Sequence, residues 1–529
     1  MKKLLHVLFV LVLLIGLNVS EGNTASAVQA KQVLRIGFDY IPVDLDPATS
    51  TDSSTTTVIK GIFEGLVRLN DAGEAVPGIA KSWTVSKDGK TYTFSLRPSA
   101  KWSNQQQVKA SDFEYAWKQA LAPQSMNSYA FKMFIIANAE NYHKGKLKES
   151  SKVGVKALNN DTLQVTLNEK TSHFPQLLAE SIYMPINAQV AKADKNWAYN
   201  IKTMVTNGPF KLQQWDENSI HLIKNPNYYT AQEIRFSEVH LLRPKAGTPS
   251  PTMAYLNNEV DWVGAKDELI DKASLNSVFP QELYALPYAS TYYYQFNLSK
   301  APFKNLKIRK ALAMAANRES IGYGTPAYGF IPRSIRGSKL NFRSEIIDTR
   351  YFKEDVIQAK KLLQEGLKEE GLTQLPSFSI IINEGHEEIA EAVINSWNKN
   401  LGITVGFEVQ PWEDLLDNRL KLNYTMAKAA WAADYNDPST FLDYFTSWSS
   451  DNDSGWSSAL YDSYIKQARL TLDTSERNKL YAKAEKMLID QMVILPLYYF
   501  YADVLHKPNI KKVSVEYDGS ISFSRGYLI

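Results

Sequence analysis

The histidine and cysteine patterns that commonly mark catalysis are incomplete in this chain of 529 residues. His386 and Glu387 begin the H-E-x-x-H pattern of zinc proteases, but Ala390 stands where the second histidine is needed. A catalytic zinc requires both imidazoles on one helical face, so this pattern predicts no zinc site. The absence of cysteine excludes disulfides, thiolate metal sites and cysteine nucleophiles. We expect no metal and no cofactor.

Serine patterns give a weaker hint of hydrolysis. Residues 463–466 match S-x-x-K and residues 450–452 match S-D-N, two elements of penicillin-recognising hydrolases. In those enzymes the nucleophile precedes the S-D-N element, whereas here the order is reversed and a K-T-G strand is missing. A G-x-S-x-G elbow and a Walker A loop are also missing. The sequence predicts a protein that is not an enzyme, and a secreted hydrolase is the alternative that a cleavage assay would test.

Asp434 is a candidate for binding rather than for catalysis. It lies in an apolar and aromatic run, residues 429–435, where an unpaired carboxylate is costly to bury. The ammonium group of a ligand would compensate its charge. The alternative is an aspartate that caps a helix or forms a turn, and Asp437 before Pro438 fits that alternative better.

The elements that would position these residues alternate between strand and helix patterns. Residues 91–96 alternate, with Tyr92, Phe94 and Leu96 on one face, and a Ser/Thr-rich stretch at 49–57 is typical of a loop before a helix at 62–66. Further helices are expected at 112–121, 353–368, 387–400 and 477–492, and strands at 162–167, 219–224, 292–297, 401–410 and 493–501. Interleaved helices and strands predict an α/β protein with mixed sheets.

Residues 1–30 have the layout of a secretory signal peptide. Lys2 and Lys3 precede an apolar stretch at 4–17, and small residues near 25–30 offer cleavage sites. An apolar run of about 14 residues is short for a membrane helix, which needs about 20. Leu17 stands where a lipoprotein signal carries its lipid-bearing cysteine, so no thioether-linked lipid is possible. We expect an exported chain, periplasmic or on the extracellular face of the cell membrane.

Composition narrows the class further. The chain has 59 Lys and Arg against 56 Asp and Glu, and 44% of its residues are hydrophobic. These values exclude a disordered chain, and a net charge of +3 gives no electrostatic case for nucleic acid. The length is too great for one hydrophobic core and predicts about two to four domains.

A long segment at residues 80–113, AKSWTVSKDGKTYTFSLRPSAKWSNQQQVKASDF, resembles the signature of the extracytoplasmic peptide-binding proteins of ABC importers, solute-binding protein family 5. The resemblance continues through NGPFKLQQWD (207–216), NPNYY (225–229), YYYQFNLSKAPFKNLKIRKALAMAANR (292–318) and AAWAADYNDPSTFLDYF (429–445). These blocks in order identify the chain as a member of that family, most similar to its oligopeptide binders. Gln105 departs from the family's common glycine, and Asn104 is able to take the left-handed conformation in its place.

The resemblance implies an α/β, two-lobed periplasmic-binding-protein fold with mixed sheets and three domains, in which the ligand is enclosed between the lobes. Domain I would be discontinuous and comprise residues 31–63, 188–289 and 500–529. Residues 64–187 would form a small domain II, and residues 290–499 would form domain III, the second lobe.

By the same resemblance, Asp434 matches the aspartate that binds the amino terminus of the peptide. Trp431, Ala430 and Ala432 would supply an aromatic wall and backbone groups. The other implied pocket positions are Lys428, Trp412, Tyr129, Tyr288, Tyr293, Gln295 and Ser53. Strand alternation places Tyr293 and Gln295 on one face and favours a core position for Tyr292 and Tyr294. For Trp412 a core position is the alternative, and Lys428 lacks the bidentate fork of the arginine that relatives can carry.

These implications predict a monomeric binding protein that captures short peptides by hinge closure and delivers them to the membrane permease subunits of an ABC importer. A receptor for varied peptides must hold the features common to all of them, and an added strand is the natural way to bind a peptide backbone. A dedicated receptor for one peptide pheromone or signal, with the same fold, remains the alternative.

Overall fold

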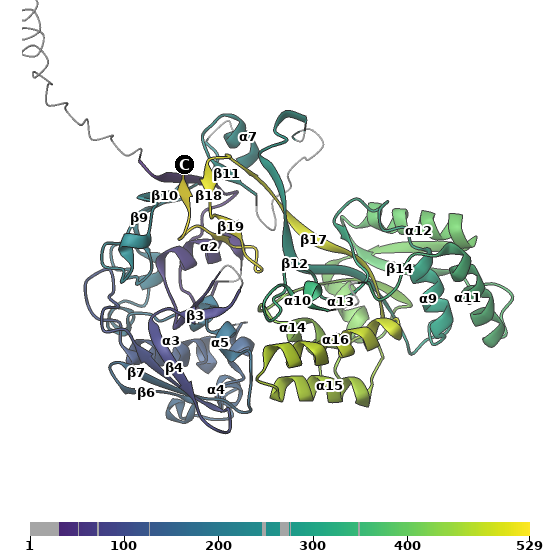
Figure 1. Cartoon of the computed structure of the whole chain (residues 1–529), viewed down its shortest axis with the longest axis horizontal. Coiled ribbons are helices and arrows are strands. Elements are labelled where there is room, and N and C mark those ends of the chain that lie inside the picture. Colours follow the sequence, from purple (N-terminus) through teal and green to yellow (C-terminus); the bar gives the residue numbers. More distant parts are fainter. Residues whose placement is uncertain are drawn as a thin grey trace, which may run out of the picture.

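The computed structural model describes residues 31–529 except 51, 71–72, 126, 128, 246–249, 265–274, 276 and 347–349. The predicted signal peptide at residues 1–30 lies outside the described residues. Within them the chain forms two lobes (Figure 1). The first lobe holds the N-terminal elements and the C-terminal residues, and the second holds the elements from α9 (Leu306–Ala315) to α16 (Thr474–Asp490).

A mixed sheet of eleven strands runs through both lobes. Its strands in spatial order are β15 (Val405–Gln410), β14 (Phe378–Asn383), β16 (Met426–Ala432), β12 (Leu283–Phe296), β17 (Ile494–His506), β11 (Trp262–Val263), β1 (Val33–Gly37), β10 (Glu238–Leu242), β9 (Ser219–Lys224) and β8 (Phe210–Trp215), with β13 (Thr325–Pro326) beside β17. Strand β14 is parallel to β15 and β16, and β1 is parallel to β10 and β11, whereas the other pairs are antiparallel. The predicted α/β class with mixed sheets is confirmed.

Strands β12 and β17 connect the lobes, and Figure 1 shows both of them crossing between the two. They pair antiparallel along most of their length, but the register shifts between Pro287 and Thr291. The interruption coincides with the predicted border between domains I and III at residues 289 and 290. The domain borders themselves stay a prediction.

The first lobe contains a separate antiparallel sheet of four strands, in the order β4 (Ala80–Val85), β5 (Thr91–Leu96), β7 (Thr162–Thr166) and β6 (Val155–Asn159). Strand β5 buries Tyr92, Phe94 and Leu96 in alternation, as its sequence predicts. Short strand pairs are β2 (Val67–Leu69) with β3 (Ala75–Pro77), β18 (Ile510–Lys511) with β21 (Tyr527–Leu528), and β19 (Ser514–Val515) with β20 (Ile521–Ser522). The helices of this lobe are α2 (Ser53–Ile62), α3 (Ala110–Ala120), α4 (Ala139–His143), α5 (Phe174–Leu177), α6 (Ala188–Ala193) and α7 (Pro251–Leu256).

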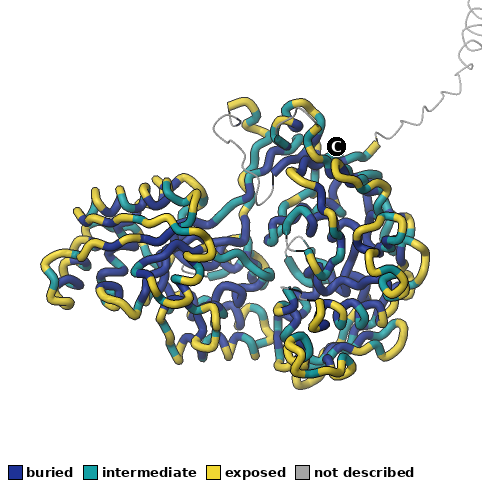
Figure 2. The backbone as a smooth tube through the Cα atoms, turned by 180° about the vertical axis from the view of Figure 1, so that it is seen from behind, coloured by how far each residue is buried: buried dark blue, intermediate teal, exposed yellow. Residues whose placement is uncertain are grey.

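The second lobe is richer in long helices. Besides α9 and α16 they are α10 (Phe342–Glu345), α11 (Val356–Glu369), α12 (Glu387–Leu401), α13 (Trp412–Leu420), α14 (Ser439–Leu442) and α15 (Ala459–Leu470). Each lobe has its own large apolar core: one draws on residues 34–262 with parts of the C-terminal segment, the other mainly on residues 289–498. Figure 2 shows buried residues inside both lobes and exposed ones on their outer loops.

The Ser/Thr-rich stretch at residues 49–57 is not the loop that its composition suggests. Helix α2 begins inside it, with Asp52 as the N-cap that accepts a hydrogen bond from Thr55 N at 2.8 Å. The hydroxyl groups of Thr56 and Thr57 donate to the carbonyl oxygens of Asp52 and Ser53 four residues back, both at 2.7 Å. The predicted helix at residues 62–66 is therefore wrong, and Ser53 occupies the first turn of α2.

The turn near Asn104 also differs from its prediction. Gln105 takes the left-handed conformation itself, with φ at 73°, and its N–H donates to Trp102 O at 2.8 Å. Asn104 instead accepts from Gln106 N through its side chain at 3.1 Å. A residue with a Cβ thus occupies the backbone position that favours glycine.

Candidate functional site

A cavity of about 220 Å³ lies where the two lobes meet. From the predicted site it brings together Ser53, Tyr129, Tyr288, Ala432 and Asp434. The remaining lining residues are Ser50, Asp52, Thr56, Lys132, Glu180, Ser181, Ala433 and Asp518. The two lobes share one polar cavity with several carboxylates.

Asp434 is positioned by the end of strand β16 and by the start of the next turn. Ala433 N donates to Ala289 O at 2.8 Å, and Asp434 N donates to Thr440 Oγ1 at 3.0 Å. Burial raises the pKa of the Asp434 carboxyl above its usual range, and the nearby Lys132 ammonium partly offsets this effect. A cationic group of a ligand would offset the free-energy cost of burying the ionised carboxylate.

Direct contacts join the lobes beside Asp434. Lys132 Nζ, from the first lobe, donates to Asp434 O at 2.9 Å. The rings of His173 and Tyr435 stack with centroids 5.1 Å apart and an interplanar angle of 3°. Arg477 Nη1 donates to Ser172 Oγ at 2.6 Å. In this conformation these three contacts already join the two lobes.

Strand β16 offers a free edge beside Asp434. Antiparallel strand β12 pairs with it from Met426 to Ala432, but on the other side β14 pairs only at Met426 and Ala427. Because Ala433 N points to β12 and alternate residues point to opposite sides, Ala430 and Ala432 direct their backbone groups to the open side. Among the described strands, none pairs with these residues there. The arrangement can accept one added extended chain.

A larger cavity of about 740 Å³ adjoins Asp434 and contains Trp431 from the predicted set. Its aromatic lining comprises Phe131, Phe134, His173, Trp431, Tyr435, Tyr444 and Trp448. The rings of Trp431 and Tyr444 pack edge-on with centroids 4.7 Å apart. Rigid aromatic walls of this kind accept varied apolar and polar groups.

Lys428 and Trp412 lie together on the second lobe. Lys428 Nζ is 5.1 Å from the Trp412 ring centroid and donates to Asn383 Oδ1 at 3.1 Å. Burial, together with the charge of Arg419, lowers the pKa of Lys428 to about 8. Trp412 is 51% exposed, so its alternative placement in the core is wrong. Neither residue lines the Asp434 cavity in this conformation.

Tyr293 and Gln295 also lie away from the Asp434 cavity. Both side chains are fully buried, and so are those of Tyr292 and Tyr294, which are expected in the core. Gln295 Nε2 donates to Asp453, whose carboxylate lies 2.8 Å from Arg419. Strand alternation places Tyr293 and Gln295 on one face of β12 and Tyr292 and Tyr294 on the other. Both faces of this strand are buried, so alternation does not identify the face that meets the ligand. A pocket role for Tyr293 and Gln295 stays a prediction.

Sequence reasoning missed four charged residues of the cavity, Asp52, Lys132, Glu180 and Asp518. Lys132 in YAFKMF and Glu180 in LLAESIYM each interrupt an apolar run, which is the same signal that singled out Asp434. Asp518 precedes a glycine and has the pattern of a turn residue. The same sequence signal was therefore available for two of the four, Lys132 and Glu180.

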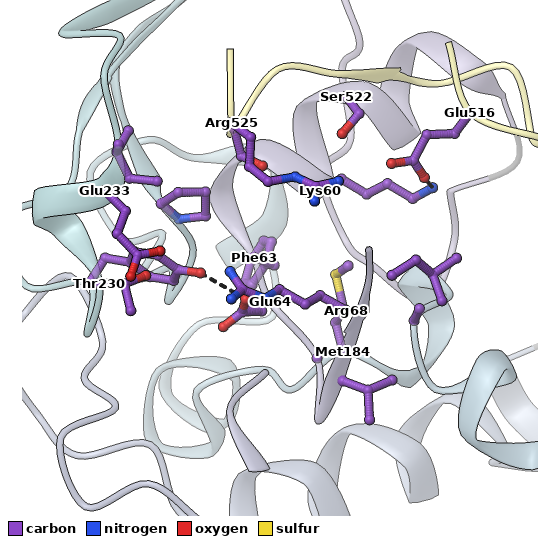
Figure 3. Close-up of a pocket in the computed structure, with 18 of the residues that line it drawn as sticks. Lys60, Phe63, Glu64, Arg68, Met184, Thr230, Glu233, Glu516, Ser522 and Arg525 are labelled. Carbon is purple, nitrogen blue, oxygen red and sulfur yellow. Dashed lines mark hydrogen bonds and ion pairs between the residues drawn. The ribbon is translucent and has the colours of Figure 1, made fainter. Parts of the chain in front are cut away.

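A separate cavity of about 120 Å³ lies on the first lobe behind Lys60 (Figure 3). It is lined by Glu64, Arg68, Thr230 and Glu233 among others, and by none of the predicted site residues. In the part of the chain that the structure describes, no three potential ligands of the His, Cys, Asp or Glu type gather as a metal site. Nor does any described helix have the length and apolar character needed to cross a membrane.

Comparisons with known proteins agree with this geometry. The family model of the bacterial extracellular solute-binding proteins, family 5, matches residues 74–453. The oligopeptide-binding protein OppA of Bacillus subtilis is 35% identical over 526 residues, covering 96% of this chain and 95% of the relative. Listeria monocytogenes OppA bound to peptide is 27% identical, with a TM-score of 0.67 and coverage of 94% and 99%.

Two solved structures of the murein tripeptide-binding protein MppA have the same sequence identity to this chain, 30%, but differ in structural similarity to it. The unliganded open form has a TM-score of 0.84, with 94% of this chain and 98% of that chain covered. The other structure, of the Escherichia coli protein, has a TM-score of 0.69 with coverage of 94% and 99%. At the same sequence identity, the structure described here is therefore more similar to the unliganded open form. The chain belongs to the bacterial extracellular solute-binding proteins of family 5.

Proposed function

We propose that this protein is an extracytoplasmic receptor that captures short peptides and delivers them to the permease subunits of an ABC importer. The observation that carries the proposal is the cavity between the lobes, where Asp434, Ala432, Tyr288, Tyr129 and Ser53 meet. The peptide-binding proteins OppA and MppA, which share its fold over nearly the whole chain, support it. The chain performs no chemistry on the peptide and acts as a monomer.

Each common feature of a peptide has a counterpart in the molecule. The ammonium binds the Asp434 carboxylate, whose burial is costly without a cation. The backbone adds to the open edge of β16 beside Ala430 and Ala432. The first side chains enter the aromatic cavity beside Trp431. Lys428 and Trp412 receive the distal part of the ligand after the lobes close.

Closure takes place at the two connecting strands. The register shift between Pro287 and Thr291 weakens the β12 and β17 pairing there, so these strands absorb the rotation between the lobes. The proposal includes the division into domain I (31–63, 188–289 and 500–529), domain II (64–187) and domain III (290–499). It also includes export through the signal peptide, with the mature chain outside the cytoplasmic membrane.

Native mass spectrometry of the purified protein tests the proposal directly, since a closing receptor retains bound peptides. Adding an equimolar library of tri- to hexapeptides and identifying the retained masses shows whether many sequences bind. Retention of a single sequence would favour the pheromone or signalling receptor. Appearance of shortened peptides would favour the secreted hydrolase, and absence of any peptide complex would contradict the proposed function.

A further inference from the structure

The cavity assigned to the amino terminus of the ligand already contains an ammonium group. Lys132 Nζ lies 2.9 Å from Asp434 O and 3.4 Å from Glu180 Oε2. The side chain of Lys132 is 12% exposed and that of Glu180 is 9% exposed. The ammonium of Lys132, from the first lobe, therefore lies between the carboxylate of Glu180 and the backbone carbonyl of Asp434, the candidate ammonium-binding residue of the second lobe.

Packing holds Lys132 in this position. Its ammonium lies 5.1 Å from the centroid of the Tyr129 ring, a favourable cation–π distance. Its carbonyl oxygen accepts a hydrogen bond from Tyr183 Oη at 2.6 Å. Burial alone would lower the pKa of Lys132, but the charges of Glu180, Asp434 and Asp518 raise it above its usual value. The side chain is thus an ammonium fixed inside the site.

The neighbouring lysine is engaged elsewhere. Lys60 Nζ lies 2.9 Å from Glu516 Oε2 and 2.6 Å from Asp518 Oδ2, and Figure 3 shows its side chain extending toward Glu516. Ser520 Oγ also accepts from Lys60 at 3.1 Å. Lys60 pairs directly with Glu516 and Asp518, whereas Lys132 is the lysine within direct contact distance of Glu180 and of Asp434 O.

We propose that Lys132 determines specificity at this site: its ammonium, held at the backbone carbonyl of Asp434, repels the amino group of a ligand that binds the Asp434 carboxylate. The inference rests on the proposed peptide-binding function. Lys132 Nζ contacts the backbone carbonyl of Asp434 rather than its carboxylate, but a ligand ammonium bound to that carboxylate would lie close to it, and like charges repel each other in a partly desolvated cavity. Lys132 therefore weakens the binding of ligand amino groups, while its charge partly compensates Asp434 in the empty site.

The variant Lys132→Met keeps most of the side-chain shape and removes the charge. It tests whether the Lys132 ammonium weakens binding of the ligand amino group. Calorimetry compares trialanine with N-acetyl-trialanine. We expect Lys132→Met to bind trialanine about tenfold more tightly than the original protein, with N-acetyl-trialanine unchanged. Lys132→Arg keeps the charge and should retain the original preference.

Lys118→Met is the matched control. Lys118 lies on α3 of the same lobe, is 15% exposed and pairs with Glu114 at 2.5 Å, but it does not line the cavity. This variant should change neither affinity. If Lys132→Met is too unstable to measure, the double variant with Glu180→Gln removes the pair together and should give the same gain for trialanine.

Other outcomes separate the inference from the proposed function. Equal loss of both peptides in Lys132→Met, together with a lower melting temperature, would mean that Lys132 merely joins the lobes and would overturn the inference. Unchanged affinities would overturn it as well. If neither the original protein nor any variant bound alanine peptides of three to six residues, the proposed function itself would be contradicted.

Discussion

At the scale of single residues, two aspartates three positions apart have different surroundings. Asp434 borders the cavities, whereas Asp437 is buried against Arg477, with 2.8 Å between carboxylate and guanidinium. Asp437 also accepts from Ser439 N at 3.0 Å. The first carboxylate is available to a ligand and the second is part of the framework.

We therefore expect Asp434→Asn to reduce peptide affinity and Asp437→Asn to reduce stability. Asp434→Asn should weaken binding of a free-amino peptide by about a hundredfold or more and leave the melting temperature nearly unchanged. Asp437→Asn removes the carboxylate that pairs with Arg477 and should lower the free energy of unfolding by about 3–5 kcal/mol, with peptide affinity largely retained in the folded protein. Calorimetry and thermal unfolding on the same preparations measure both. Similar behaviour of the two variants would contradict the assignment.

The amino group of the ligand provides a second test at this scale. Burial raises the pKa of Asp434, so its carboxylate becomes protonated at a higher pH than that of an exposed aspartate. Affinity for a free-amino peptide should be full near neutral pH and should fall as the pH is lowered through that raised pKa. An N-acetylated peptide should bind at least about 150-fold more weakly at neutral pH and show little pH dependence. Parallel pH profiles for both peptides would exclude Asp434 as the ammonium partner.

At the scale of elements, the open edge of β16 makes the peptide backbone part of the binding energy. A peptide amide that faces Ala430 or Ala432 donates or accepts a backbone hydrogen bond, worth about 0.5–1.5 kcal/mol. N-methylation of that amide should weaken binding by about 2- to 13-fold or more, since the methyl group also blocks close approach. N-methylation of the next amide, which faces away from β16, is the matched control. Equal effects at both positions would speak against strand addition.

At the scale of the whole molecule, the lobes should close on the ligand. The arrangement is similar to an open, unliganded relative, and Trp412 is 51% exposed in it. Saturating peptide should reduce the radius of gyration in small-angle X-ray scattering and quench or shift the fluorescence of Trp412. Asp434→Asn should show neither change at the same peptide concentration. A radius of gyration that stays constant in the original protein under saturation would contradict hinge closure.

Ligand breadth is also a property of the whole cavity system. The aromatic cavity of about 740 Å³ beside Asp434 has room for varied side chains and for bridging water. Peptides of about three to six residues should stabilise the protein against heat, by about 2.7 kcal/mol at a concentration of 100 times Kd, whereas single amino acids lack the strand hydrogen bonds and should stabilise it less. Thermal-shift screening of a peptide library measures this. Stabilisation by one sequence alone would favour the signalling receptor.

The sequence by itself determined the α/β fold class, the position of many helices and strands, and Asp434 as the main candidate for ligand binding. Strand β9 is predicted to the residue, and the ends of α11, α12 and α16 to within three residues, because period and capping signals are local. Asp434 was found because a carboxylate in an apolar run is costly wherever the run is buried. Five ordered motifs supplied the two-lobed architecture by resemblance, which no local pattern contains.

Tertiary structure decided which charges share the cavity. Lys132 and Asp434 are 302 positions apart, and Lys60 and Asp518 are 458 apart, so no sequence period relates them. Helix α2 began inside the Ser/Thr stretch because Asp52 caps it and its threonines are buried, a consequence of packing that composition does not show. Tyr293 and Gln295 were placed on one face by alternation, but burial of β12 on both faces removed the distinction between core and ligand side. Local preferences fix elements, whereas the site depends on contacts that form only when the lobes meet.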